Sequence, residues 1–596
     1  MKRGKIRKVL KVWLVINLLA NIGYADIKVD KGVQQNTRVD RAQNGANIIN
    51  INTPNSKGIS VNDYSEFKTK DPTVFNNFGS GVGRSYLAGM MASNPNLSKE
   101  QYARLILNRV NGAERAEIEN WLEVMSDHKT DLIFSSNQGF YLNNTGFINF
   151  DKVIFTTSKV FLDSNGDIQP FNIRGGSINV GREGINAEGL QYLALLSKQI
   201  SIDGIISAKD GDLDLIAGDF DYNPNTREYI NRASYNGDML ISASAYGSIY
   251  GQQIKVVANG GDLGVKSDMI GYKVLAINAD GTVKTNQVQG NSEVNIKAKE
   301  YIQEGSTYTE GNLNITADKT ILAGTGTQAE NINITGKLDN QTNIYAKGNI
   351  IVGNDTVNTG KLISEKGLTV SGNLNTSNVV YGKDLINISG GLFNSSDIQS
   401  EGNITIGLST TNKGRILTDN ILHINGSTVN DGTLYGKNKV VVQDLTNTGS
   451  VQSTGDITAK NVVNIGKIVG EGSITVLDLN NQNELVTNKA LTTNNLTNTG
   501  TLNTGEGISS NGNVVNHGVL NTNGGFLILG NLNNYNLLNV GETLNTRDLI
   551  NHGSLKAVDS LLTKGTTFYN QGEVLTTNLN VDNINIQNTN NDIKLK

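Results

Sequence analysis

Residues 494–507, NNLTNTGTLNTGEG, nearly repeat residues 445–455, LTNTGSVQSTG, and this recurrence decides the fold. Both segments belong to a series aligned on the pattern Asn-x-Gly-x-aliphatic, with successive spacings of 17 to 19 residues. An aliphatic residue follows each Asn slot by four positions, from Ile344 to Val574. Thr376 fills one slot in step, and the others are Asn340, Asn358, Asn394, Asn412, Asn430, Asn447, Asn464, Asn481, Asn498, Asn516, Asn534, Asn551 and Asn570.

A unit of this length predicts one turn of a right-handed parallel β-helix, so the expected fold class is all-β. The unit is too short for a pair of helices, and Asn, Thr, Gly, Val and Ile favour strands and turns. Leucine-rich repeats are longer and carry denser leucines. Fourteen coils stacked at about 4.8 Å would give a rod of roughly 65 Å. Disorder is the rival for a chain with 37% hydrophobic residues, but the regular aliphatic positions disfavour it.

The Asn slot itself predicts a ladder of side-chain hydrogen bonds. An Asn at a fixed corner can donate its amide to the Asn of the next coil. We expect this ladder along Asn412, Asn430, Asn447, Asn464, Asn481, Asn498 and Asn516. The proline distribution agrees, because all five prolines lie within the first 224 residues and a sheet interior excludes proline.

The N-terminus predicts export from the cytoplasm. A basic run at residues 2–8 precedes an apolar segment at 12–23, as in a secretory signal peptide cleaved after Ala25. This segment is too short for a comfortable membrane span, and no later stretch could form one. The chain has no cysteine, so no disulfide can stabilise the exported protein.

The charge balance argues against a nucleic-acid partner. Residues 1–25 hold six of the 51 Lys and Arg residues and no acid, which leaves 45 basic against 55 acidic residues in the remainder. Phosphate binding needs a positive surface, and this chain is acidic after the signal peptide.

Residues 26–245 lack the period but carry blocks of motif in a characteristic order. The segment Asn94-Pro95-Asn96-Leu97 is followed by the block Leu107-Asn108-x-Val110-x-Gly112. These blocks resemble the secretion domain of the two-partner-secretion exoproteins, the filamentous haemagglutinin and haemolysin family, in which NPNL is a motif. The second motif, NPNGI, aligns with residues 136–140 and keeps only its Gly.

The resemblance implies a short β-helix with an antiparallel cap, recognised by a partner outer-membrane barrel with periplasmic modules. The residues implied in transporter recognition are Asn94, Pro95, Asn96, Leu97, Asn137 and Gly139. The expected organisation is a signal peptide (1–25), a secretion domain (26–245), an irregular β-helix continuation (246–339), the repeat β-helix (340–580) and a polar tail (581–596). One local conflict concerns residues 98–110 and 113–125, which have helical propensity although the resemblance implies strands at 104–110 and about 117–125. We follow the resemblance there and expect a loop or short helix at 97–103.

No constellation of residues indicates an enzyme, a cofactor or a metal site. His517 and His552 occupy the same slot, which we interpret as a surface position. Residues 163–167, DSNGD, resemble the start of a calcium loop but lack its later ligands, so an Asn-Gly hairpin turn is expected. At least one of three alternating aspartates should face inward or toward a corner, and calcium stays an open alternative there: Asp210, Asp212 and Asp214.

We therefore expect a secreted or surface-exposed bacterial exoprotein that acts as a haemagglutinin-like adhesin. It would pass the periplasm and outer membrane through its partner transporter and bind a host-cell or bacterial surface ligand. The alternative is a haemolysin or contact-dependent toxin-delivery exoprotein of the same family, possibly a shortened copy, because only 26 residues follow Asn570. An autotransporter passenger is disfavoured, since the terminal Leu595-Lys596 does not resemble the end of a translocating barrel.

Overall fold

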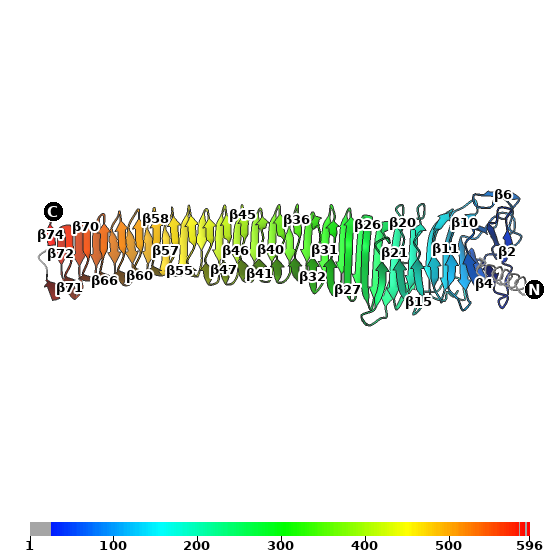
Figure 1. Ribbon diagram of the computed structural model, residues 1–596, viewed down its shortest axis with the longest axis horizontal. Helices are drawn as coiled ribbons and strands as arrows, with labels where there is room; N and C mark the ends of the chain where they lie inside the picture. Colours follow the sequence, from blue (N-terminus) through cyan, green and yellow to red (C-terminus); the bar gives the residue numbers. More distant parts are fainter. Residues whose placement is uncertain (1–25, 583–584, 590–592, 596) are drawn as a thin grey trace, which may run out of the picture. The chain divides into compact units, whose positions relative to one another are not determined.

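The computed structural model describes residues 26–582, 585–589 and 593–595, so the predicted signal peptide lies outside the described residues. The described chain contains strands, turns and bends, and no helix. It divides into two compact units, residues 1–308 (unit 1) and 309–596 (unit 2). Each unit is a parallel β-solenoid, which confirms the predicted fold class (Figure 1).

Unit 1 begins with an antiparallel cap, as the resemblance implied. β1 (Asp26–Val29) pairs antiparallel with β4 (Ile59–Thr69), and β2 (Arg38–Arg41) forms an antiparallel hairpin with β3 (Asn47–Asn50). β3 also pairs in parallel with β5 (Thr73–Asn76). The pairing therefore changes from antiparallel in the cap to parallel in the coils across β3.

Beyond the cap, the coils of unit 1 contribute strands to three parallel stacks. The first stack follows β4 and contains β8 (Leu105–Val110), β11 (Thr130–Ser136), β14 (Phe150–Thr156), β18 (Tyr192–Ser197) and β21 (Asp212–Gly218). The second contains β9 (Ala116–Ile118), β12 (Phe140–Leu142), β16 (Ser177–Val180), β19 (Gln199–Ile202) and β24 (Met239–Ala243). The third contains β10 (Leu122–Met125), β13 (Thr145–Ile148), β17 (Ile185–Asn186), β20 (Ile206–Ala208) and β25 (Ile249–Asn259).

The local conflict between helix and strand is decided in favour of strands. β8, β9 and β10 occupy the two segments that have helical propensity. The Ser98 backbone N–H and hydroxyl both donate to Gln101 Oε1 at 3.0 Å, so the contacts of a helix-capping box form at a turn that no helix follows. Parallel pairing of β8 with both β4 and β11 satisfies the backbone and overrides the local propensity.

The segment 246–339, expected as an irregular continuation, is built from coils of similar length. In unit 1, Leu263 pairs with Val283 and Val283 pairs with Tyr301, offsets of 20 and 18 residues. In unit 2, Leu313 pairs with Ile332, an offset of 19. The coil geometry therefore extends through residues whose sequence period is hard to see.

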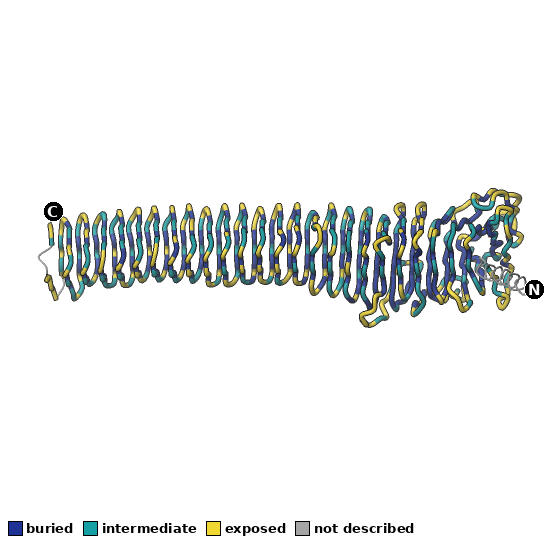
Figure 2. Tube along the Cα trace, viewed as in Figure 1, coloured by how far each residue is buried: buried dark blue, intermediate teal, exposed yellow. Residues whose placement is uncertain are grey.

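The two repeated segments of unit 2 form equivalent turns of one stack. Residues 494–507 supply β60 (Asn495–Asn498) and β61 (Thr501–Thr504), and β62 (Ile508–Ser510) completes the coil. Leu496 and Leu502 are buried inside the coil, and Leu502 pairs with Leu485 before it and Leu520 after it. Buried and outward residues alternate around each coil of unit 2, as Figure 2 shows.

The predicted Asn ladder is present and buried. Asn447 accepts a hydrogen bond from Asn430 Nδ2 at 2.7 Å and donates its own amide to Asn464 Oδ1 at 2.8 Å. Its Nδ2 also reaches the carbonyl oxygens of Gly449 at 3.2 Å and Lys467 at 3.1 Å. The same coil-to-coil bond links the whole predicted set Asn412, Asn430, Asn447, Asn464, Asn481, Asn498 and Asn516, each with 0% exposure.

The ladder is interrupted once, at the slot that Thr376 fills. Asn358 Nδ2 donates to Thr376 Oγ1 at 2.9 Å, which confirms the register. The Thr376 hydroxyl then donates to the Asn378 carbonyl at 2.7 Å. A hydroxyl has a single proton, so Thr376 cannot also donate to Asn394 on the next coil. The series of side-chain hydrogen bonds stops at Thr376 and begins again with Asn394, which donates to Asn412 at 2.8 Å.

The predicted polar tail is corrected by the structure, because its described residues continue the coils. β73 (Asn585–Asn588) pairs in parallel with β71 (Thr567–Asn570), and β74 (Ile593–Leu595) pairs in parallel with β72 (Glu573–Val581). Asn588 takes the ladder slot and accepts from Asn570 at 3.1 Å. The repeat pattern misses this coil because Asp592, four positions after the slot, is not aliphatic.

Replacing Asn447 with Ala should destabilise unit 2 locally by about 3 kcal/mol, because the change leaves buried partners on both neighbouring coils without their hydrogen bonds. Thr446→Ala, on the exposed face of the same strand, should cost less than about 0.5 kcal/mol. Amide hydrogen exchange near residues 430–467 and denaturant midpoints of the full chain would measure both. Equal effects of the two substitutions would contradict a structural role for the ladder.

Candidate functional site

The NPNL motif forms a turn whose first residue, Asn94, is buried in the cap and binds its backbone. Asn94 is 1% exposed, and its Nδ2 donates to the carbonyl oxygens of Ile51 at 2.9 Å and Asn76 at 2.8 Å. Its Oδ1 accepts from the Asn96 backbone N–H at 2.9 Å. One buried amide therefore joins the ends of β3 and β5 to the segment that enters β8.

The remaining NPNL residues face in different directions. Asn96 Nδ2 donates to the Asn36 carbonyl at 2.8 Å, and Leu97 is buried with 7% exposure. Pro95 is exposed. Of the four NPNL residues, Pro95 alone is exposed, while Asn94 and Leu97 hold the shape of the cap.

The remnant of the second motif is also a turn, and its glycine is required by geometry. Gly139 has φ +101°, and a Cβ there would lie 2.1 Å from the Ser177 carbonyl oxygen. Its N–H donates to the Ser136 carbonyl at 3.0 Å, and its carbonyl accepts from the Ala116 N–H at 3.0 Å. Asn137 lies exposed at the tip of this turn.

The two groups of predicted recognition residues lie at different turns. NPNL follows β7 (Gly89–Ala92) and contacts the loops around Asn36 and Ile51, whereas the 137–139 turn joins β11 to β12. Within the part of the chain that the structure describes, no hydrogen bond joins the two turns. Their shared role as one recognition surface stays a prediction.

A buried carboxylate that sequence reasoning missed anchors a hairpin beside the cap. Glu123 is 2% exposed and accepts from Ser85 Oγ at 2.7 Å and from the backbone N–H groups of Tyr86 and Leu87, each at 2.8 Å. These donors belong to the hairpin of β6 (Val82–Ser85) and β7. The hairpin presents the exposed side chains of Val82, Tyr86 and Met90, so it is an apolar projection held by one acid.

Two of the three alternating aspartates bind one arginine. Asp214 is buried on the outer face of its strand with 2% exposure and binds Arg227 Nη2 at 3.2 Å, while Asp212 binds Arg227 Nη1 at 2.9 Å. Tyr192 donates its hydroxyl to Asp214 at 2.7 Å and lies 2.7 Å from the Tyr222 hydroxyl. Burial raises the pKa of Tyr222 to about 12, and burial beside Asp214 raises the pKa of Tyr192 well above its ordinary value. This network ties the small sheet of β15 (Phe171–Ile173), β22 (Phe220–Asn223) and β23 (Glu228–Asn231) to unit 1.

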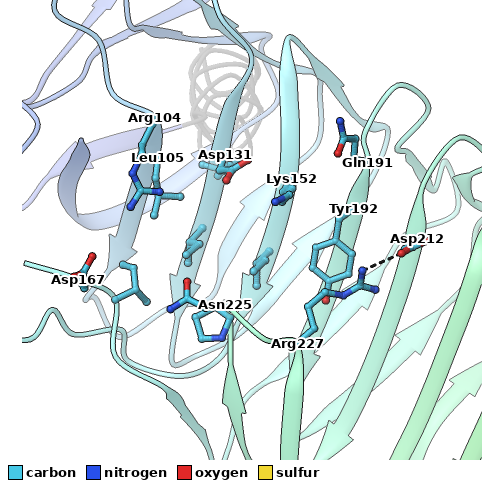
Figure 3. Close-up of a pocket in the computed structure, with 15 residues that line it drawn as sticks. Arg104, Leu105, Asp131, Lys152, Asp167, Gln191, Tyr192, Asp212, Asn225 and Arg227 are labelled. Atoms are coloured by element: carbon cyan, nitrogen blue, oxygen red, sulfur yellow. Dashed lines mark hydrogen bonds and ion pairs between the residues drawn. The ribbon is translucent and has the colours of Figure 1, made fainter. Parts of the chain in front are cut away.

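A cavity of about 400 Å³ lies beside this network on strands β8, β11, β14 and β18 (Figure 3). Leu105, Ile133 and Ile154 line it together with charged side chains. Several of those charges are already paired, since Asp167 binds Lys57 at 3.0 Å and Asp212 binds Arg227. The cavity therefore has a mixed lining, in which aliphatic side chains lie beside polar and charged groups and two of the acids are paired.

The other candidates from the sequence are structural. Asp163 Oδ1 accepts from the N–H groups of Asn165 and Asp167, which forms the expected hairpin turn at 163–167. His517 and His552 are exposed, as expected, and stack on either side of the Tyr535 ring, with centroid distances of 4.4 and 5.2 Å. A search of the described residues finds no group of three metal-ligating side chains. Nor does that part of the chain contain a helix long and apolar enough to cross a membrane.

The cap, the coils and the NPNL turn define a class of protein. Residues 25–285 match the family model of the TPS secretion domain, so the chain carries the secretion domain of the two-partner-secretion exoproteins. This match confirms the resemblance and extends past residue 245, where the sequence interpretation ended the domain.

Individual relatives share this N-terminal part. The filamentous hemagglutinin of Bordetella pertussis is 29% identical over 242 residues, 39% of this chain and 7% of that protein. The 16S rRNA endonuclease CdiA of Enterobacter cloacae is 26% identical over 295 residues, 47% of this chain and 8% of that protein. The tRNA nuclease CdiA of Yersinia mollaretii is 26% identical over 336 residues, 54% of this chain and 11% of that protein. The chain thus spans about a tenth of these relatives' length.

A solved structure, the filamentous hemagglutinin secretion domain, aligns over 48% of this chain and 96% of its own chain. The sequences are 24% identical there, with a TM-score of 0.42.

Gly139→Ala should destabilise unit 1 by more than about 3 kcal/mol, because the new methyl group meets the Ser177 carbonyl and the backbone has positive φ. Gly81→Ala is a matched control: Gly81 has φ +76° but nothing within 4 Å of the added Cβ, so the cost should be about 1 kcal/mol. Denaturant unfolding of both variants measures the difference. Similar costs would show that the close approach at Gly139 is unimportant.

The sheet of β15, β22 and β23 should loosen at alkaline pH. The folded state favours the neutral Tyr222 phenol, so this stabilisation is present below the ordinary pKa of 10.0 and is lost as pH rises through about 12. Hydrogen exchange of β22 and β23 between pH 9 and 12 would follow the change. Tyr222→Phe should reduce the pH dependence, whereas Tyr86→Phe, at an exposed position, should leave it unaltered.

Proposed function

We propose that this protein is a secreted, surface-exposed adhesin that a partner outer-membrane transporter exports. The carrying observation is the TPS secretion domain at residues 25–285 with an intact NPNL turn. Asn94 holds that turn against the ends of β3 and β5, so the domain has a defined cap for a transporter to recognise. The proposed function needs no catalytic residue, cofactor or nucleic acid.

Recognition by strand addition suits the edge of the cap. β2 pairs with β3 and with no other strand in the described ranges, so its outer edge offers backbone donors and acceptors. Ion pairs of Arg38 with Asp40 and of Arg41 with Asp71, each at 2.6 Å, place charge along that edge. Charged edges limit unspecific pairing, while a periplasmic module with a complementary strand can still add to the sheet.

Unit 2 supplies the surface that the proposed adhesin presents. Its coils contact mainly their neighbours through backbone pairing and the Asn ladder. Each coil can therefore fold onto the previous one as the chain emerges outside, without disulfides. We propose that binding to a host-cell or bacterial surface is distributed over the outward strand faces.

A second candidate is a toxin-delivery or haemolytic exoprotein. The observation in its favour is that relatives such as the Enterobacter cloacae and Yersinia mollaretii proteins carry the names of toxic nucleases. Unit 2 would then serve as the stalk that places an effector near a target cell. Lysis of red cells or growth inhibition of neighbouring bacteria by the secreted chain would favour this candidate over adhesion.

Secretion assays can separate the two ways in which NPNL could act. Asn94→Ala should lower both release into the medium and the stability of the cap, because three segments lose a shared buried amide. Pro95→Ser changes an exposed residue, so it should leave stability near wild type and reduce release only if the transporter reads Pro95 directly. Release is measured by cell fractionation with the partner transporter co-expressed.

The control for both variants is Asn225→Ala, an exposed position away from the NPNL turn, which should be released normally. Normal release of a variant that lacks Asn94–Leu97 entirely would contradict the proposed role of this turn.

A further inference from the structure

One outward face of unit 2 carries an apolar stripe that runs through nine consecutive coils. Each member lies at the centre of the strand after the ladder corner, points away from the coil interior and pairs in register with the next member. Seven of the nine are aromatic or aliphatic. The stripe consists of Tyr345, Ile363, Tyr381, Gln399, Leu417, Tyr435, Gln452, Val469 and Val486.

The stripe ends sharply at its C-terminal side. The next three positions in the same row are Asn503, Asn521 and Asn539. Asn521 donates to Asn503 at 2.9 Å and Asn539 donates to Asn521 at 2.8 Å, so this continuation is a polar ladder of amides. The apolar character is thus confined to one patch and is not a general property of the face.

Charged side chains border the stripe on both sides in a self-complementary order. Three coils, three turns apart, present a cation, an aliphatic residue and an acid across the strand: Lys361-Ile363-Glu365, Arg415-Leu417-Asp419 and Lys467-Val469-Glu471. Within these three coils the cations lie on one border and the acids on the other, while Lys347, Lys383 and Lys437 share the border of the acids and Asp397 and Glu484 share the border of the cations. A two-fold axis parallel to the coil axis would place each cation opposite the acid of the same coil in a second copy.

We propose that this stripe is the interface of a homodimer in which two copies of unit 2 lie side by side, parallel and in register. The aromatic and aliphatic residues of the two stripes pack together, and the three mixed-charge coils form ion pairs across both borders. This arrangement gives the apolar centre and charged rim that are common in protein interfaces.

One coil of the patch, the coil of Gln399, carries an acid on both borders, and both acids already have partners within the same chain. Asp397 and Glu401 flank Gln399, and in the dimer the two acids face each other. Asp397 binds Arg415 through two hydrogen bonds of 2.8 and 2.6 Å, and Glu401 accepts from the Tyr381 hydroxyl at 3.2 Å. Their charges are therefore partly engaged before association.

The antiparallel arrangement is less favourable. It would set each border row against its own reverse. With all nine coils engaged, Glu365 meets Glu471, Lys361 meets Lys467, and Asp419 and Arg415 each meet their own counterparts, while only Glu401 meets an opposite charge, Lys437. These like-charge contacts disfavour the antiparallel dimer relative to the parallel dimer, in which the mixed-charge coils meet with opposite charges.

The size of the patch suits a reversible dimer. Nine coils at about 4.8 Å and strands of about four residues give an area of about 40 Å by 13 Å on each copy. The accessible surface of the patch is larger than this flat area because side chains protrude from it, and it approaches the roughly 800 Å² per partner of a standard interface. The proposed dimer is therefore expected to form in the micromolar range.

The absence of native cysteine allows a direct test of the register. Leu417→Cys, Ile363→Cys and Val486→Cys each place one thiol on the stripe of the full secreted chain. In the parallel dimer every stripe residue faces its own counterpart, so mild oxidation should cross-link all three variants. Val429→Cys and Thr405→Cys, outward on the other two strand faces, are controls that should stay monomeric.

The dimer itself is tested by sedimentation velocity across a concentration series. Leu417→Asp should abolish association, Glu365→Lys should weaken it about tenfold through two like-charge contacts, and the swap Glu365→Lys with Lys361→Glu should restore it. A monomer at all concentrations, or cross-linking at one stripe position alone, would overturn the parallel dimer. Cross-linking of the controls as readily as the stripe variants would overturn it equally.

Discussion

Burial of an amide side chain at the same corner of successive coils, from Asn340 onward with one exception at Thr376, is the constraint on which unit 2 depends. A buried Asn must satisfy two N–H groups and a carbonyl oxygen, and a single coil cannot supply all the partners. Asn447 meets this demand with the Asn of the coil before it, the Asn of the coil after it and backbone carbonyl groups. The stacking of coils therefore satisfies the polar corner, and the aliphatic row beside it supplies the hydrophobic burial.

Unit 1 solves a similar problem with single, specific contacts. Asn94 bridges the carbonyl groups of Ile51 and Asn76 as a ladder Asn bridges neighbouring coils, but it does so once, where antiparallel pairing changes to parallel. Glu123 anchors a hairpin, and Arg227 joins Asp212 and Asp214 to the outer sheet. These contacts hold segments that lie outside the regular stacks of strands. A ladder between equivalent coil positions cannot bind such segments.

The sequence predicted the coil, its register and the ladder because the period places chemically equivalent residues at one corner. At residues 98–125 the expectation of strands was correct only because it followed the resemblance: helical propensity is local, whereas the pairing of β8 with β4 and β11 joins segments far apart in the sequence. The sequence pattern failed at β73, because Asp592 breaks the motif although Asn588 keeps the slot. The roles of Glu123 and Arg227 could not be predicted, since each contact joins a strand to a hairpin or loop whose position only the fold determines. The NPNL motif was found from resemblance, but its inward-facing Asn94 and Leu97 required the structure.

The interruption of the ladder at Thr376 has a mechanical consequence. Bacterial surface proteins that grip a target bear tension when fluid flows past the cell. The Thr376 hydroxyl donates its only proton to the Asn378 carbonyl. The contact between the coils of Thr376 and Asn394 therefore lacks the buried side-chain hydrogen bond that joins Asn412 to Asn430. Under a pulling force this contact is the weakest among its neighbours, so it would yield first and let the coils on either side stay intact while the chain lengthens.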